Sequence, residues 1–89
     1  MRCVVSVLGK DRSGIVAAVS GVLAEKGGNI IDISQTILSE IFSMTMIVDL
    51  NTDIAGFNDV QEELERTSEE LGVQIILQRE DVFQFMYKI

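Results

Sequence analysis

The sequence predicts an α+β fold of the ferredoxin-like type, a βαββαβ sandwich in which a four-stranded antiparallel sheet carries two helices on one face. Three observations predict this fold. Four short runs are rich in β-branched residues, two segments carry apolar residues at helical spacing, and the order is strand, helix, strand, strand, helix, strand. With right-handed crossovers through both helices, the four strands form one sheet, and a short C-terminal helix follows.

The first strand is expected over residues 1–8, and the segment 9–14 separates it from the first helix. Ser13 is the predicted N-cap of this helix, because its hydroxyl can accept a free N–H of the first turn. The helix is expected to close at the glycine pair 27–28. Its apolar stripe consists of Ile15, Val19, Val22 and Leu23.

Residues 29–38 and 41–50 form two further β-rich runs. The two-residue connection Ser39-Glu40 predicts a hairpin, although it lacks the favoured Asn-Gly chemistry. Residues 51–56 are expected to form a loop before the second helix, and residues 73–79 the fourth strand.

The second helix is expected to have one buried face and one solvated acidic face. Asn58 and Gln61 suggest a capping-box pair, and Gly72 is the predicted residue just past the C-terminus. The buried stripe is Phe57, Val60, Leu64 and Leu71. The solvated face carries Asp59, Glu62, Glu63, Glu65, Arg66, Glu69 and Glu70.

The tail 80–89 fits two patterns. Its aromatic residues alternate as in a strand, yet its apolar residues also fit a helix that begins with acids and ends with Lys88, as the helix dipole prefers. A short helix over residues 81–89 is predicted, and the domain core is assigned to residues 2–79 of one domain over residues 1–89.

The alternation of side chains along the strands predicts two different faces of the sheet. The face that the helices cover is expected to hold Cys3, Val5, Val7, Ile31, Ile33, Ile37, Phe42, Met44, Met46, Val48, Leu50, Val73, Ile75 and Leu77. The outer face would hold Ser6, Asp32, Ser34, Thr36, Ser43, Thr45, Asp49, Gln74 and Gln78 with Val4, Leu8, Ile30, Ile41, Ile47 and Ile76. Such a mixed surface indicates that a partner subunit or the C-terminal tail packs on it, and a homodimer is predicted.

The composition argues against some classes of partner and against a membrane location. With 47% apolar and 24% charged residues the chain is expected to fold compactly, and its net charge of −7 argues against nucleic acid as a partner. No stretch approaches the roughly 18–20 apolar residues of a membrane span, and the first residues lack a signal-peptide pattern, so no membrane association and a cytoplasmic location are expected. Cys3 is interpreted as a buried apolar residue of a strand.

The chain offers little for catalysis. It contains no histidine, which excludes His-based dyads and triads, and a metal site would depend on carboxylates that the helical spacing directs to solvent. We therefore predict no catalytic residue, no metal and no cofactor.

The most informative local feature is the segment 9–16, Gly-Lys-Asp-Arg-Ser-Gly-Ile-Val, which connects a strand to the start of a helix. Free N–H groups and the positive end of the helix dipole favour a carboxylate or phosphate there, and Gly14 permits close approach to the backbone. The alternative interpretation is a tight, capped turn that binds nothing.

This segment, together with Leu-Ala-Glu-Lys-Gly-Gly-Asn-Ile-Ile-Asp at 23–32, resembles the signature of the ACT domain, a small regulatory fold that binds amino acids. Asp-Ile-Ser-Gln-Thr at 32–36 and Phe-Met-Tyr-Lys-Ile at 85–89 resemble, more narrowly, stand-alone ACT proteins of bacteria and archaea. Ser13 replaces the proline that is common in the motif.

The resemblance implies a ligand site at a dimer interface, between the loop after the first strand and the beginning of the second strand of a neighbouring subunit. Carried over to this sequence, the implied ligand-binding residues are Asp11, Arg12, Ser13, Gly14, Ile15 and Val16, with Asn29, Ile30 and Ile31 opposite. Regulatory ACT domains are usually fused to an enzyme, so the resemblance also implies a regulated partner protein.

Three functions compete at this point. The first is a non-catalytic, amino-acid-responsive regulatory dimer, and the second is a protein–protein interaction or oligomerisation module without a small ligand. The third is an enzyme of the acylphosphatase type, in which Lys10 and Arg12 would cradle a phosphate, but the glycine-arginine loop pattern of that family is missing.

Overall fold

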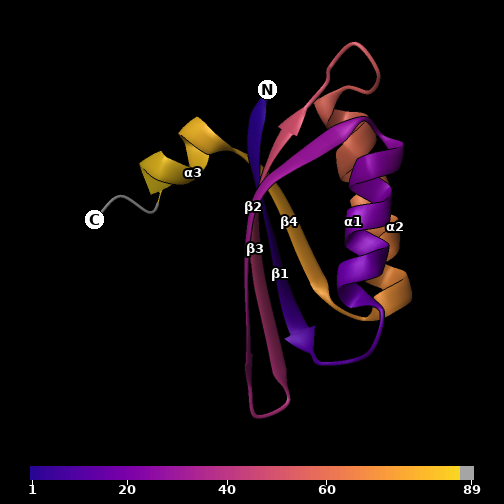
Figure 1. The fold of residues 1–89 in the computed structure, drawn as a ribbon, viewed down its shortest axis with the longest axis vertical. Coiled ribbons are helices and arrows are strands. Elements are labelled where there is room, and N and C mark those ends of the chain that lie inside the picture. Colours follow the sequence, from indigo (N-terminus) through magenta and orange to yellow (C-terminus); the bar gives the residue numbers. More distant parts are fainter. Residues whose placement is uncertain (87–89) are drawn as a thin grey trace.

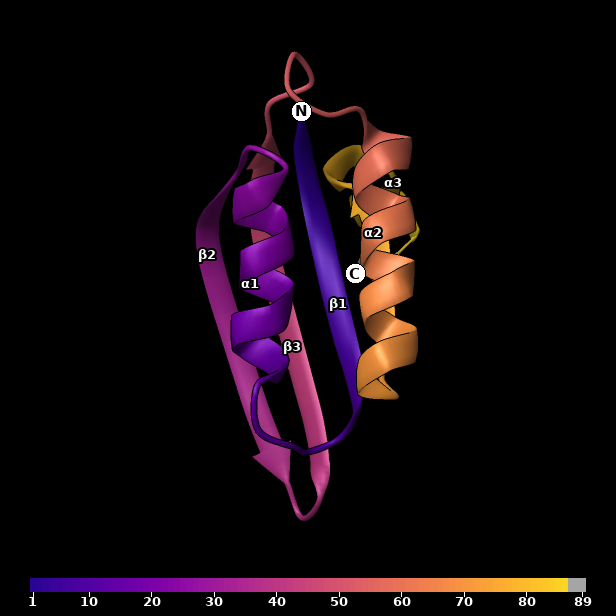
Figure 2. The same cartoon turned by 90° about the vertical axis from the view of Figure 1, so that its right-hand side faces the viewer.

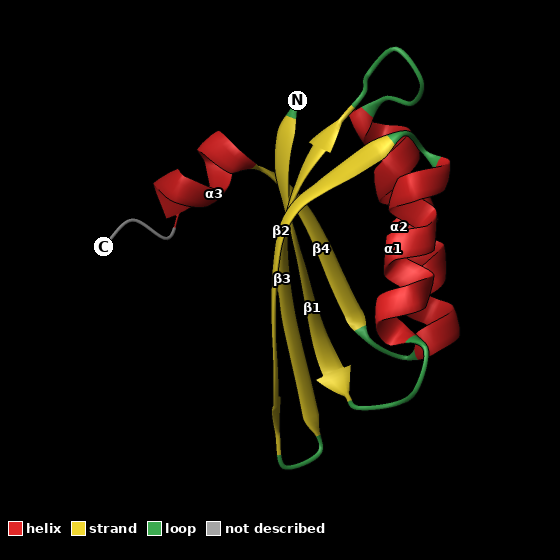
Figure 3. Cartoon of the chain, in the orientation of Figure 1, coloured by secondary structure: helices red, strands yellow, loops and turns green. Residues whose placement is uncertain are grey.

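The computed structural model describes residues 1–86 and confirms the predicted order of elements (Figure 3). The elements are β1 (Arg2–Lys10), α1 (Ile15–Glu25), β2 (Gly28–Leu38), β3 (Ile41–Leu50), α2 (Phe57–Leu71), β4 (Gln74–Arg79) and α3 (Glu80–Met86). The first strand is longer than predicted, because Gly9 and Lys10 still pair with Phe42 and Ile41 of β3.

The four strands form one antiparallel sheet in the order β2-β3-β1-β4. Both α1 and α2 cover the same face, with α1 over the β2–β3 side and α2 over the β1–β4 side (Figures 1 and 2). The hydrophobic core lies between this face and the helices. Its fully buried side chains are Cys3, Val5, Val7, Ile15, Val19, Leu23, Met44, Met46, Val48, Val60 and Leu64.

A β-bulge in β2 corrects the predicted face of two isoleucines. The pairing with β3 shifts by one residue between Ile30 and Asp32, so that Ile30 lies opposite Val48 and packs against the core. The prediction had placed Ile30 outside and Ile31 inside, because strict alternation ignores an inserted residue. After the bulge the expected alternation returns, with Ile33 opposite Met46 and Ile37 opposite Phe42. The prediction that the helices cover these two side chains is wrong, because Ile33 is 42% and Ile37 58% exposed.

Both predicted helix starts are wrong by one or two residues. The N-cap of α1 is Gly14, at φ 89°, rather than Ser13, and no described side chain caps this end. At α2 the N-cap is Gly56, whose N–H donates to the Asp59 carboxylate at 3.2 Å, so the pair Asn58 and Gln61 is not used. The predicted role of Gly72 is confirmed: it adopts φ 69°, and its N–H donates to the Ser68 carbonyl at 2.9 Å.

The outer face of the sheet is only partly covered by the tail. The predicted C-terminal helix is present as α3 over residues 80–86, and the last three residues of the prediction lie outside the described part of the chain. α3 starts beside the pair formed by Cys3 and Arg79. It projects on the side of the sheet opposite α1 and α2 (Figure 1). Val4 is therefore buried at this end, whereas Leu8 at the other end of β1 is exposed.

The turn between β2 and β3 is strained. Ser39 adopts φ 59°, the only positive φ of a non-glycine residue in residues 1–86. This conformation costs an L-residue about 1–2 kcal/mol, and glycine avoids most of that cost. Ser39→Gly is therefore expected to raise the free energy of unfolding by roughly 1 kcal/mol in urea titrations. Glu40→Gly, at a negative φ, should lower it instead, and a stabilisation by both variants would contradict the explanation.

Cys3 is fully buried in β1, and this burial raises the pKa of its thiol above the ordinary value. The native state then keeps the thiol proton to a higher pH than the unfolded chain does. This contribution to stability is complete below about pH 8.5 and declines as the pH rises through the raised pKa. We expect the stability of the wild type to fall more steeply above pH 8.5 than that of Cys3→Ala, and parallel pH curves would exclude this effect.

Within the described residues, no helix is long and apolar enough to cross a membrane.

Candidate functional site

The candidate site begins with the loop between β1 and α1. The N–H of Asp11 donates to the Glu40 carbonyl at 2.7 Å, which ties the loop to the β2–β3 turn. On its other side, Nη1 of Arg12 donates to the carbonyl of Leu71, the last residue of α2, at 3.3 Å. The loop is therefore held between the hairpin turn and the C-terminal end of α2, and its Asp11, Arg12, Ser13 and Gly14 are exposed.

The start of α1 offers backbone donors rather than side chains. The first intrahelical bond runs from the Ala18 N–H to the Gly14 carbonyl at 2.9 Å, so the N–H groups of residues 15–17 have no partner within the helix. The side chains of Ile15 and Val16 pack in or against the core, which leaves only their backbone for a ligand. A Cβ built on Gly14 meets no described atom within 4 Å, so the space above this glycine is open. Chemically, this end of the helix suits an anion.

The second half of the predicted site lies elsewhere in the same chain. Asn29, Ile30 and Ile31 open β2, which follows the C-terminal end of α1 (Figure 1). The 11 residues of α1 therefore separate them from the loop, a length of about 16 Å. One chain does not bring the two halves together.

Asn29 instead borders a cavity of about 480 Å³ at this end of the sheet. It pairs with Asp49 of β3, whose Oδ1 accepts from the Met1 amino group at 3.2 Å. The lining is mostly polar and comprises Met1, Gly27, Asn29, Asp49, Leu50, Asn51 and Thr52.

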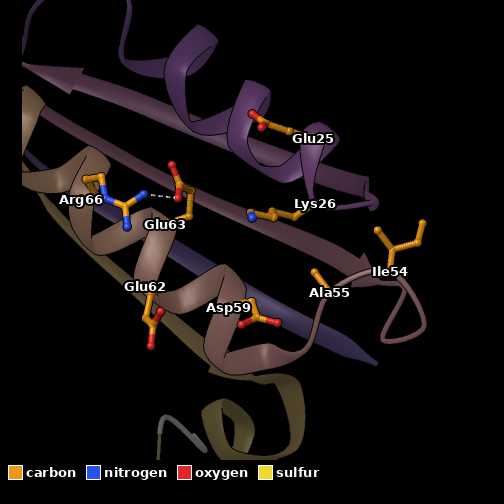
Figure 4. Close-up of a pocket in the computed structure, with 8 residues that line it drawn as sticks. All are labelled: Glu25, Lys26, Ile54, Ala55, Asp59, Glu62, Glu63 and Arg66. Atoms are coloured by element: carbon orange, nitrogen blue, oxygen red, sulfur yellow. Dashed lines mark hydrogen bonds and ion pairs between the residues drawn. The ribbon is translucent and has the colours of Figure 1, made fainter.

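A second hollow, of about 340 Å³, lies between the C-terminal end of α1 and the first half of α2 (Figure 4). The side chains that α2 contributes to it were predicted to form a solvated surface, because the closeness of the two helices cannot be deduced from spacing within one helix. Arg66 forms an ion pair with Glu63 here. The lining residues are Glu25, Lys26, Ile54, Ala55, Asp59, Glu62, Glu63 and Arg66. Among residues 1–86, no group of three or more His, Cys, Asp or Glu side chains is arranged to hold a metal ion.

Comparison with known proteins connects this geometry to a family. The family model described as the ACT domain matches residues 2–78. A UPF0237 protein of Methanocaldococcus jannaschii is 53% identical over 88 residues, which cover 99% of this chain and 98% of that protein.

Solved structures agree with this match. The structure of an ACT domain protein from Streptococcus pneumoniae has a TM-score of 0.81 and 43% identity, with 94% of each chain covered. The regulatory subunit of aspartate kinase from Thermus thermophilus, in its ligand-free form, has a TM-score of 0.66 and 29% identity over 86% of this chain and 50% of that one.

Proposed function

The chain belongs to the ACT domain family, and on this premise we propose that it is a non-catalytic regulatory protein that binds an amino acid between two copies of the chain. The observation that carries the proposal is the uncapped start of α1, where backbone N–H groups stand free beside the open space at Gly14. In this proposal the ligand's carboxylate accepts hydrogen bonds from these groups, because the helix terminus supplies both donors and about half a unit of positive charge. Its ammonium needs acceptors, and the Asn29 side-chain oxygen of the neighbouring copy provides one.

A second copy is needed because the two halves lie apart in one chain. The free edge of β2 supports a way to join them. Ile33 donates its N–H to the Asp32 carboxylate at 2.9 Å rather than to β3, which indicates that it points to the open edge. By the alternation along a strand, the N–H groups of Gln35 and Ile37 point the same way. With no proline or lysine in β2, this edge can pair with another strand.

Antiparallel pairing of two β2 strands about Ser34 completes the proposed site. Residue 29 precedes this centre by five positions, one of which is the inserted residue of the bulge, and residue 39 follows it by five. Asn29 of one copy would therefore lie close to Leu38 and Ser39 of the other. That turn is the one to which Asp11 is tied through the Glu40 carbonyl. The pairing thus brings the start of β2 of one copy to the loop of the other, and both sites of the two-fold dimer form together.

Binding of the ligand is tested by calorimetric titration with each of the twenty amino acids. For an amino acid that binds, Asn29→Ala is expected to weaken binding by about 1–2 kcal/mol, because a buried hydrogen bond to a charged group is lost. Asn58→Ala, at an exposed amide of α2, is the matched control and should bind as the wild type does. Gly14→Val should block close approach of the carboxylate, with a thermal melt to confirm that this variant still folds. Unchanged affinity in both site variants would show that the site is assigned wrongly.

A second function has its own support. The tip of the β2–β3 hairpin extends past the helices and exposes Ile37, Leu38 and Ile41, with Leu38 73% exposed (Figure 2). Apolar side chains grouped at an exposed tip favour a protein–protein interaction module. If none of the twenty amino acids binds, while Leu38→Ser abolishes capture of a regulated partner protein, this second function replaces the first.

A further inference from the structure

We propose that the outer face of the sheet is a second self-association surface, on which α3 of another copy packs against Leu8 and Ile76 beside Lys10. This surface is separate from the β2 edge, and the inference does not depend on the amino-acid site or on pairing of β2. Where both contacts form, four copies assemble.

The outer face of the sheet is covered by α3 at one end and open at the other. Because α3 starts at the end of the sheet where Cys3 pairs with Arg79, it stands over that end only (Figure 1). The end of β1 at Lys10 remains open on this face. The projecting helix and the open half of the sheet thus form a corner, and a second copy turned end for end places its own α3 on the open half.

Exposed apolar side chains lie both on the open half of the sheet and on α3. Leu8 is 50% exposed on β1, and Ile76 is 40% exposed on the neighbouring strand β4. They are diagonal neighbours on the same face, since Leu8 pairs with Gln74 and Ser6 pairs with Ile76. On α3, Val82 is 44% exposed although the helix contacts β1 and β4 of its own chain. Each copy therefore presents both an apolar patch and an apolar side chain to cover it.

Opposite charges indicate that a second copy of the chain occupies the outer face, and they set the direction in which it lies. Lys10 is exposed at the open end of β1, and α3 begins with Glu80 and Asp81. Asp81 already pairs with Arg79 of its own chain at 2.9 Å, so Glu80 is the acid that would meet Lys10. A two-fold axis that crosses the strands brings the acidic start of α3 in one copy to Lys10 of the other, twice in each dimer. The outer sheet face carries two cations, Arg2 and Lys10, and two anions, Asp32 and Asp49, so it does not repel a copy of itself. The helix face would repel another copy of itself, because α2 carries six carboxylates and one arginine.

A charge exchange tests this contact in the full chain. Lys10→Glu is expected to halve the mass seen by light scattering at micromolar concentration and to weaken the association about tenfold, because the like charges meet twice. Glu80→Lys should do the same, and the double variant should regain the association. Arg66→Glu, an equal charge change on α2, is the control and should keep the wild-type mass. An unchanged mass in both single variants, or no recovery in the double variant, would overturn the proposal.

Cross-linking adds a readout that does not depend on affinity. Mild oxidation of a mixture of Lys10→Cys and Glu80→Cys chains should give a covalent dimer that contains one chain of each kind. Each variant alone should stay largely uncross-linked, because like positions lie at opposite ends of the interface. Equal cross-linking within the single variants would contradict the proposed direction. Loss of β2 pairing leaves this result unchanged, so the two contacts can fail independently.

Discussion

Gly9→Val is expected to lower the free energy of unfolding by about 3 kcal/mol, at the upper end of the usual cost of overpacking. A Cβ on Gly9 would lie 2.7 Å from Cγ1 of Val73, 2.9 Å from its Cβ and 3.1 Å from its Cα. The side chain of Val73 could turn aside, but its backbone joins α2 to β4 and cannot move alone. This glycine of the motif is thus required by packing rather than by a ligand.

Urea unfolding followed by circular dichroism measures the effect. Gly21→Ala is the matched control, because a Cβ on Gly21 meets no described atom within 4 Å, and it should stabilise α1 by about 0.5–1 kcal/mol. Val73→Ala in the Gly9→Ala background should recover part of the loss caused by Gly9→Ala alone. If Gly9→Val unfolds at the wild-type urea concentration, the close approach of Val73 is not a constraint.

The second large effect is expected from Gln35→Pro. Proline removes the N–H that points to the open edge of β2 and leaves the bonds between β2 and β3 in place, so the folded chain should persist. Pairing of two β2 strands should fail, and with it amino-acid binding, because each proposed site takes residues from both copies. Light scattering should show half the wild-type mass, and calorimetry no heat with an amino acid that binds the wild type.

Gln35→Ala separates the backbone from the side chain in this experiment. It keeps the N–H and should therefore retain both the mass and the affinity of the wild type. A Gln35→Pro protein that folds, keeps its mass and still binds the amino acid would show that the site does not need the β2 edge.

Local patterns were enough to predict the order of elements and most of the core. The stripe of α1 needed only the helical period, and Ile15, Val19 and Leu23 are indeed buried. In α2 the period continues to Thr67, which the apolar pattern missed. Burial of this polar residue is tolerated because its hydroxyl donates to the Glu63 carbonyl at 3.0 Å. The bulge at Ile30 was not predictable, because an inserted residue depends on the pairing with β3.

The candidate site was predictable only in part. The strand-to-helix loop and its glycine are local features, and Gly14 does open the start of α1. The caps were misjudged because serine and asparagine compete with glycine for these positions, and the backbone conformation decides between them. The bond from Arg12 to the Leu71 carbonyl joins residues 59 positions apart, which no local pattern predicts. The two halves of the site lie apart in one chain. Only the topology shows this separation, because it depends on where α1 places the start of β2.

The short strand β4 limits how large an assembly can become. It is the other edge of the sheet, but it has only six residues and runs directly into α3. Long, unpaired edges are the ones that recruit strand after strand into fibres, and within the described residues β2 is the only long edge. When two copies join through β2, both long edges are used and the remaining ones are the short, helix-terminated β4 strands. Strand addition therefore stops at a closed particle rather than continuing as amyloid-like growth.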